Sequence, residues 1–465
     1  MRRFWAVARH TFIEIVRLRT TTIFLLALAA ILLLVPAISG GGTPRDRVQT
    51  FLVYSMGLAT VVLSLLTILA GCRIVCGEQA RKYVFAPLTK PVSRWVYVLG
   101  RWTGLAMFQV LLVAAVGTAV YGTAQVMRRQ VSDPLERHLL DNQVFAARVR
   151  VAPTSFEEDL PVRTREILDR MRQGGRLEGL GATELEGAYA SAALAARQSL
   201  QTVQPLGRLQ WRFTGLPVPA DERASVEFHF IAKATRAPAG AGLHGVWLFA
   251  DTAEGEFFRW PVALTGGVPQ TFPVDQEATL LLPAQIVGRD GRMAVEFLHV
   301  RPNDPAGTFQ TTITLDPEDM YMIYPVARFE ANFLRAALLV LFGQMFLGST
   351  TLLAGTWLSF PVSCMACFMV YGMGLMRSFL VEATQIRYKS GFWTYLGRYV
   401  YGGLKHLMPD FTLIGTSSTL VDGLLIPWPR VAVAGVVFVV VWTGLSLAIA
   451  SFIFSRRELA GVMAE

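Results

Sequence analysis

The stretch at residues 72–104, CRIVCGEQARKYVFAPLTKPVSRWVYVLGRWTG, lies between two long apolar segments. It carries six basic residues and one carboxylate, that of Glu78. An excess of Lys and Arg in a short loop marks the cytoplasmic side of membrane spans. We therefore expect a cytoplasmic loop at 72–101, which fixes the direction of the apolar segments on both sides of it.

Six apolar segments have close to the roughly 20 residues that a helix needs to cross a bilayer. They lie at about 20–39, 50–71, 102–122, 334–358, 360–381 and 431–454. Because their number is even and both ends of the chain are basic, both termini are expected in the cytoplasm. The sequence thus predicts an α-helical, multi-pass protein of the cytoplasmic (inner) membrane, with three transmembrane helices in 20–124 and three in 331–465.

The excess of basic over acidic residues lies entirely in the apolar parts of the chain. The net charge is +9, yet residues 125–330 hold 21 basic and 26 acidic residues. A nucleic-acid-binding protein needs a basic patch on a folded domain, and the insertion at 125–330 is acidic on balance. We therefore expect the lipid bilayer, and not nucleic acid, as the partner of the positive charge.

The insertion at 125–330 is expected to be an extracytoplasmic α+β domain. Residues 125–203 have helical spacing, with an Ala-rich run at 182–203. Residues 204–330 change to short alternating runs such as SVEFHFIAKA, separated by turns, which indicate a β-sandwich or jelly-roll core. Residues 317–333 are expected to lead back to the membrane as an amphipathic segment.

Two further segments are amphipathic. Residues 1–19 place arginines on one helical face and apolar side chains on the other, which favours a helix lying in the membrane interface. A plain extension of the first span is the alternative. Residues 382–430 are expected outside as an amphipathic segment rich in aromatic and basic residues. Arg377, inside the fifth span, is expected either to face the bundle or to reach the outer interface.

Motifs of catalysis are missing from the sequence. It contains no GxxxxGK[ST], GxSxG or HExxH pattern, so neither a bound cofactor nor an enzymatic activity is expected. The histidines have no metal-ligand spacing, and His229 and His299 are read as structural residues of strands. The pairs Cys72/Cys76 and Cys364/Cys367 lie in or beside apolar spans, which favours packing over redox or zinc chemistry.

The loop at 72–101 resembles that of permeases of the type-2 class of ABC exporters. The resemblance rests on Glu78 just after a span, on Pro-Val-Ser-Arg at 91–94, and on Gly100 followed by Arg101. It extends to the six-span frame and to SRRELA at 455–460, but not to the insertion. The family pattern often has Gly-Thr about where Lys82 and Tyr83 stand, and Lys in place of Arg101.

The resemblance implies a subunit that works as a homodimer or with a second permease. A separate cytoplasmic ATPase would bind the ATP. Its docking helix would be formed by Glu78, Gln79, Arg81, Lys82, Tyr83 and Phe85, and Pro91 and Arg94 would fix entry into the third span. A loop that merely orients the spans is the alternative for these residues. For the whole chain, the alternative is a membrane-anchored extracytoplasmic protein whose β-sandwich binds a ligand or cell-wall material, or senses one.

Overall fold

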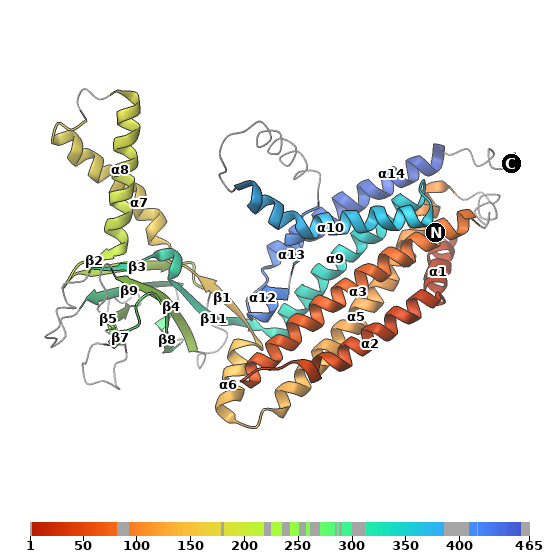
Figure 1. The fold of residues 1–465 in the computed structure, drawn as a ribbon, viewed down its shortest axis with the longest axis horizontal. Helices are drawn as coiled ribbons and strands as arrows, with labels where there is room; N and C mark the ends of the chain where they lie inside the picture. Colours follow the sequence, from red (N-terminus) through yellow and green to blue (C-terminus); the bar gives the residue numbers. More distant parts are fainter. Residues whose placement is uncertain are drawn as a thin grey trace. The chain divides into compact units, whose positions relative to one another are not determined.

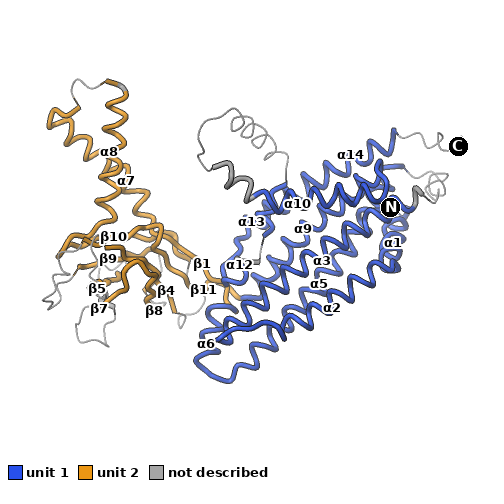
Figure 2. Tube along the Cα trace, in the orientation of Figure 1, with its two compact units in different colours: residues 1–144, 329–465 blue, residues 145–328 orange. Residues whose placement is uncertain are grey.

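A computed structural model describes residues 2–80, 93–177, 181–217, 225–234, 242–250, 257–260, 270–283, 286–287, 291–299, 312–385, 409–415 and 417–456. The chain divides into two compact units (Figure 2). The first, the helical unit, comprises Met1–Val144 and Phe329–Glu465, and the second, the strand-rich unit, comprises Phe145–Arg328.

Within the described part of the chain, six helices of the helical unit are long and apolar enough to cross a membrane (Figure 1). They are α2 (Arg19–Ile38), α3 (Pro44–Ala80), α5 (Arg94–Gln130), α9 (Phe329–Gly355), α10 (Phe360–Gln385) and the stretch Trp428–Arg456. This last stretch consists of three consecutive segments, α13 (Trp428–Gly435), the π-helical η5 (Val436–Trp442) and α14 (Thr443–Arg456). The six predicted apolar helices are thereby confirmed, and they indicate a multi-pass membrane protein.

Shorter helices complete this unit. They are α1 (Arg2–Val16), α6 (Pro134–Gln143), η4 (Phe411–Leu413) and α12 (Ser417–Val421). Both ends of the expected loop at 72–101 are helical, because α3 continues to Ala80 and α5 begins at Arg94. Of the expected amphipathic segment 382–430, residues 386–408 lie outside the described residues, and α13 already begins at Trp428.

Helix α3 is the central helix of the unit and packs against α2, α5, α9 and α10. A second group of contacts joins α9 to the C-terminal part of the chain. The ring of Phe346 on α9 lies 5.7 Å from that of Phe438 in η5, and both rings contact Phe411 in η4. These aromatic contacts tie the last helical stretch to the middle of the bundle.

The strand-rich unit consists of two antiparallel sheets. One has the order β1-β11-β4-β10-β2, with β8 also paired to β4, and the other has the order β3-β9-β5-β6, with β7 also paired to β5. The strands are β1 (Ala146–Val151), β2 (Thr202–Val203), β3 (Arg208–Thr214), β4 (Ser225–Ala234), β5 (Leu243–Ala250), β6 (Phe257–Trp260), β7 (Gln270–Phe272), β8 (Glu277–Pro283), β9 (Arg292–His299), β10 (Ile313–Leu315) and β11 (Tyr321–Arg328).

One apolar core is shared by the two sheets. On β4 the side chains of Val226, Phe228 and Phe230 are buried in it, as their alternation predicts. From the other sheet, Trp247 on β5 meets Phe228 with 4.9 Å between ring centroids. The strand-rich region that the sequence predicts is thus confirmed, with its core between the sheets.

Two helices of this unit, α7 (Ser155–Gln173) and α8 (Ala182–Gln201), pack against each other and rise from the sheets (Figure 1). The Ala-rich sequence of α8 permits this close packing, since Ala192 and Ala196 are buried. The helical part expected at 125–203 also contains other structure. Its first residues continue α5 and form α6 in the helical unit, and residues 146–151 form β1.

Strand β11 occupies the middle of the segment that the sequence suggests as an amphipathic bridge at 317–333. It pairs with β1 and with β4, so it lies inside the sheet. Pro325 makes this strand difficult to recognise from the sequence, because proline cannot donate a hydrogen bond to a neighbouring strand. The structure places Pro325 opposite Arg148, next to a shift in the register between β1 and β11.

We expect a soluble fragment of residues 145–328 to fold alone, with a strand-containing circular dichroism spectrum and a cooperative melt. Trp247→Ala should lower its free energy of unfolding by about 3–5 kcal/mol, because this side chain is fully buried. The matched control is Tyr189→Ala on α8, where the side chain is exposed and a change below about 0.5 kcal/mol is expected. A non-cooperative melt, or equal effects of the two changes, would contradict the shared core.

Candidate functional site

Helix α1 lies in a groove of α5 that two glycines form. Gly100 and Gly104 are four residues apart, and a Cβ on Gly100 would approach the Cβ of Val7 to 2.9 Å. A Cβ on Gly104 would approach the Cβ of Thr11 to 2.7 Å. Small residues at this spacing let helices approach closely in membranes. The apolar face of α1 is therefore packed on protein, with Ala8, Thr11 and Ile15 buried.

A charged pair joins the same two helices. The Arg101 guanidinium donates to the Glu14 carboxylate at 2.8 Å, and the Arg101 side chain is only 5% exposed. Its Nε also donates to the hydroxyl of Tyr97, at 3.3 Å. A buried guanidinium needs a countercharge, and Glu14 supplies it from α1. The pair thus couples the position of the N-terminal helix to that of α5.

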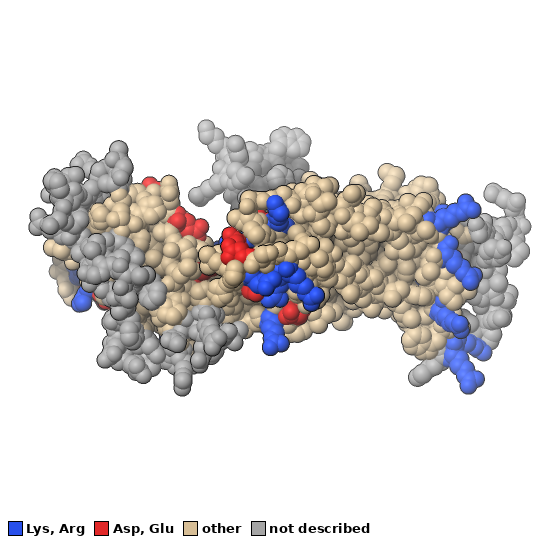
Figure 3. All heavy atoms as spheres, turned by 90° about the horizontal axis from the view of Figure 1, so that it is seen from below, with Lys and Arg blue, Asp and Glu red and all other residues tan. Residues whose placement is uncertain are grey.

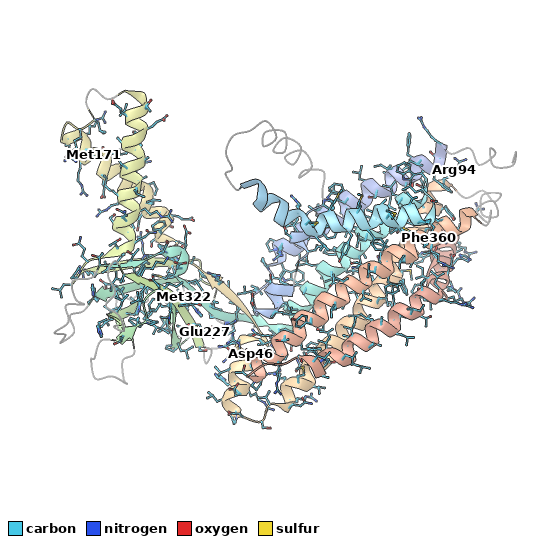
Figure 4. All side chains as sticks on the ribbon, viewed as in Figure 1. Asp46, Arg94, Met171, Glu227, Met322 and Phe360 are labelled. Atoms are coloured by element: carbon cyan, nitrogen blue, oxygen red, sulfur yellow. The ribbon has the colours of Figure 1, made fainter. Side chains whose placement is uncertain are left out.

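Positive charge gathers at this end of the helical unit, which we call the basic end. It holds α1, the start of α5 and the last turn of α14 (Figure 1), and these elements carry Arg2, Arg3, Arg9, Arg94 and Arg456. Arg94 donates to the carbonyls of Phe454 and Ser455, so it connects the first turn of α5 to the end of α14. Figure 3 shows basic side chains at this end and an uncharged surface along the helices. Figure 4 places Arg94 and Phe360 at the basic end and Asp46 at the other.

Most of the residues expected to dock an ATPase lie outside the described residues. These are Arg81, Lys82, Tyr83, Phe85 and Pro91. Glu78 and Gln79 belong to the last turn of α3, at the basic end, and Arg94 is the first residue of α5. The described residues therefore bring the two ends of the expected docking segment to the basic end, next to α1.

Arg377 on α10 forms an ion pair with Asp410. The distance between its Nη1 and the carboxylate is 2.8 Å, and the two side chains are 17% and 31% exposed. Asp410 also accepts from the backbone N–H of Thr412, which fixes the start of η4. The countercharge of Arg377 thus comes from the segment before the last helical stretch.

A cluster of neutral polar side chains lies inside the bundle, where α3, α5 and α9 meet. We call Ser64, Thr67, Gln109 and Gln344 the polar cluster. The Gln344 amide accepts from Thr67 at 2.9 Å and donates to Ser64 at 2.9 Å. The side-chain amide of Gln109 donates to the backbone carbonyl of Gln344 at 2.8 Å. Among the described residues, the side-chain oxygen of Gln109 has no partner. Such bonds specify how helices pack in an apolar setting.

A cavity of about 210 Å³ lies beside the polar cluster. Its walls come from α3, α9, α10 and the η4 segment. Ser64 and Gln344 are among its polar lining residues, and Tyr371 and Phe411 are among its aromatic ones. The bundle therefore contains a partly open cavity that both polar and apolar side chains line.

The four cysteines of the chain converge between α3 and α10. The sulfurs of Cys72 and Cys367 are 4.0 Å apart, and Cys76 lies 3.6 Å from the hydroxyl of Ser363. All four are buried as free thiols. Within the described part of the chain, no three His, Cys, Asp or Glu side chains are arranged to hold a metal ion. The thiols fill the apolar contact between the two helices.

The strand-rich unit carries a polar network on the face of its larger sheet. His229 lies between the carboxylates of Glu227 and Glu277, at 3.4 Å and 3.1 Å, and its ring stacks on that of Tyr321. The Tyr321 hydroxyl donates to Glu277. Burial and this bond raise the pKa of Tyr321 to about 12. Because these groups satisfy one another, the network is a structural feature of the sheet.

Sequence reasoning missed Glu14, Asp410 and the polar cluster. A signal existed for Glu14 and for the polar cluster: Glu14 is a lone carboxylate in a basic helix, and Gln109 and Gln344 are isolated polar residues within apolar spans. The spacing of Gly100 and Gly104 was a further signal, since it matches the small-residue pattern of helix contacts.

In comparisons with known proteins, no family model, curated protein or solved structure matches the chain.

Proposed function

We propose that the chain is the membrane-spanning permease subunit of an ATP-driven ABC exporter. It works as a homodimer or with a second permease, moves its substrate outward, and hydrolyses no ATP itself. A separate cytoplasmic ATPase binds at the basic end. The strand-rich unit then lies outside the cytoplasm.

The arrangement at the basic end is the observation that carries this proposal. There α1 is held on α5 by the buried pair of Glu14 and Arg101, and Arg94 links α5 to α14. A displacement of the segment between α3 and α5 would be transmitted through these contacts to α1, α5 and α14. A protein whose spans only anchor a domain outside the cell would not need contacts that couple the movements of these helices.

The test is purification of the full-length chain from its native membranes in a mild detergent. We expect a subunit with a GxxxxGK[ST] motif to co-purify, and ATP hydrolysis in reconstituted vesicles to require both subunits. A chain that purifies without any nucleotide-binding subunit would favour the membrane-anchored binding or sensory protein.

Sidedness gives a second test. In a variant without native cysteines, Ser191→Cys on α8 should react with an impermeant maleimide in intact cells. Ser455→Cys, at the end of α14, should react only after lysis. Both serines are exposed, and the exchange is nearly isosteric. Because the basic end is expected in the cytoplasm, labelling of Ser455→Cys in intact cells would invert the topology and remove the ATPase from reach.

A further inference from the structure

Some side chains that line the cavity beside the polar cluster have hydrogen-bonding groups that the described residues do not use. Tyr371 borders the cavity, and among the described residues none bonds to its hydroxyl. Gln344 also borders it, and toward the described residues its side-chain amide donates one hydrogen bond, to Ser64. A polar group in an apolar setting gains free energy when a partner reaches it. The cavity therefore offers two donors to a molecule that enters it.

The described residues of the cavity wall are all uncharged. Of the described residues that line it, none is Asp, Glu, Lys, Arg or His. A charged group that entered would lose its hydration without gaining a countercharge, and the cost of this is high in a membrane. The molecule that fits is uncharged.

The wall also holds the hydroxyls of Thr60 and Ser64, which donate to backbone carbonyls of α3. Its remaining described residues are largely apolar, with Met56, Val61, Val340, Leu347 and Leu375 among them. A sugar would leave most of its hydroxyls without partners there, and each would cost free energy. The volume of about 210 Å³ lies below the roughly 300–1,000 Å³ of sites that enclose a whole drug-sized ligand. It suits one apolar chain and one polar group.

We infer that this cavity binds a neutral lipid through a single acyl chain and an adjoining hydroxyl or ester group. The chain lies against the apolar wall, and the polar group meets the Tyr371 hydroxyl and the Gln344 amide. This inference does not rest on the proposed function, since binding is measured without transport or ATP.

Photolabelling tests it. The probe is a monoacylglycerol with a diazirine in its acyl chain, added to the full-length protein in lipid nanodiscs and read out by mass spectrometry of labelled peptides. We expect labelling in the part of α3 that lines the cavity, between Met56 and Ser64. A diazirine fatty acid, which is a carboxylate at pH 8, should label these residues far less.

Two glycines give a matched pair of variants. Gly57 borders the cavity and an added Cβ would meet open space, so Gly57→Leu should fill the cavity and reduce labelling about tenfold or more, as a packed interior admits no chain. Gly444→Leu on α14, also with open space around its Cβ, is the control and should leave labelling unchanged. Tyr371→Phe should weaken binding about two- to tenfold, the range of one net hydrogen bond.

Three results would overturn the inference. They are full labelling of Gly57→Leu, an equal loss in Gly444→Leu, and equal labelling by the carboxylate probe. Thermal melts of each variant in the same nanodiscs establish that it is folded. Full labelling of Tyr371→Phe would remove the assigned polar contact.

Discussion

Glu78→Lys, or Arg81→Glu together with Lys82→Glu, is expected to abolish recovery of the ATPase with the purified chain. The reason is electrostatic, because these residues flank or form the expected docking segment and reversed charge repels a complementary surface. We expect recovery to fall about tenfold or more, since like charges at an interface cost several kcal/mol. The amount of chain inserted in the membrane should stay the same.

The control for this experiment is Arg129→Glu at the far end of α5. Arg129 is exposed and lies away from the basic end, so its reversal should leave ATPase recovery unchanged. Undiminished recovery in the Glu78 and Arg81/Lys82 variants would show that the segment only orients the spans. The permease itself would then have to be assigned another docking surface.

Glu14→Gln is expected to destabilise the helical unit by about 3 kcal/mol, since it removes the carboxylate that bonds the buried Arg101 guanidinium at 2.8 Å. Glu14 is itself 31% exposed, so the low end of the range for buried pairs applies. The change would be measured as a loss of thermal stability of the full-length chain in detergent.

Arg9→Gln is the matched control, because it removes one charge from an exposed position of the same helix. It should shift stability by less than about 0.5 kcal/mol. The double change Glu14→Leu with Arg101→Met should be milder than Glu14→Gln alone, since it removes both charges of the pair together. Equal effects of Glu14→Gln and Arg9→Gln would mean that the pair contributes little.

The sequence was sufficient for the elements whose signal is local. Long apolar runs need only their own length to identify a span, and the alternation of Val226, Phe228 and Phe230 needs only a buried face. The ends of helices were harder to place. Polar and basic residues at 72–80 and 94–101 resembled a loop, yet the helices α3 and α5 continue through them.

Contacts between distant segments could not be derived from residue patterns. Glu14 and Arg101 are 87 positions apart, and Cys72 and Cys367 are 295 positions apart. Nothing in the periodicity of one helix states which helix covers it. Strand β11 was missed for a different reason, because Pro325 weighs against a strand unless its partner has an irregular register at that point.

The pairing of β1 with β11 makes the strand-rich unit a removable cassette. The chain enters it near Ala146 and leaves it at Arg328, and these two residues are opposite each other in the sheet. Paired residues of antiparallel strands have Cα atoms only about 4.5–5.5 Å apart. A linker of a few residues can therefore close the gap between α6 and α9, so the unit can be gained, lost or exchanged without lengthening any helix of the bundle.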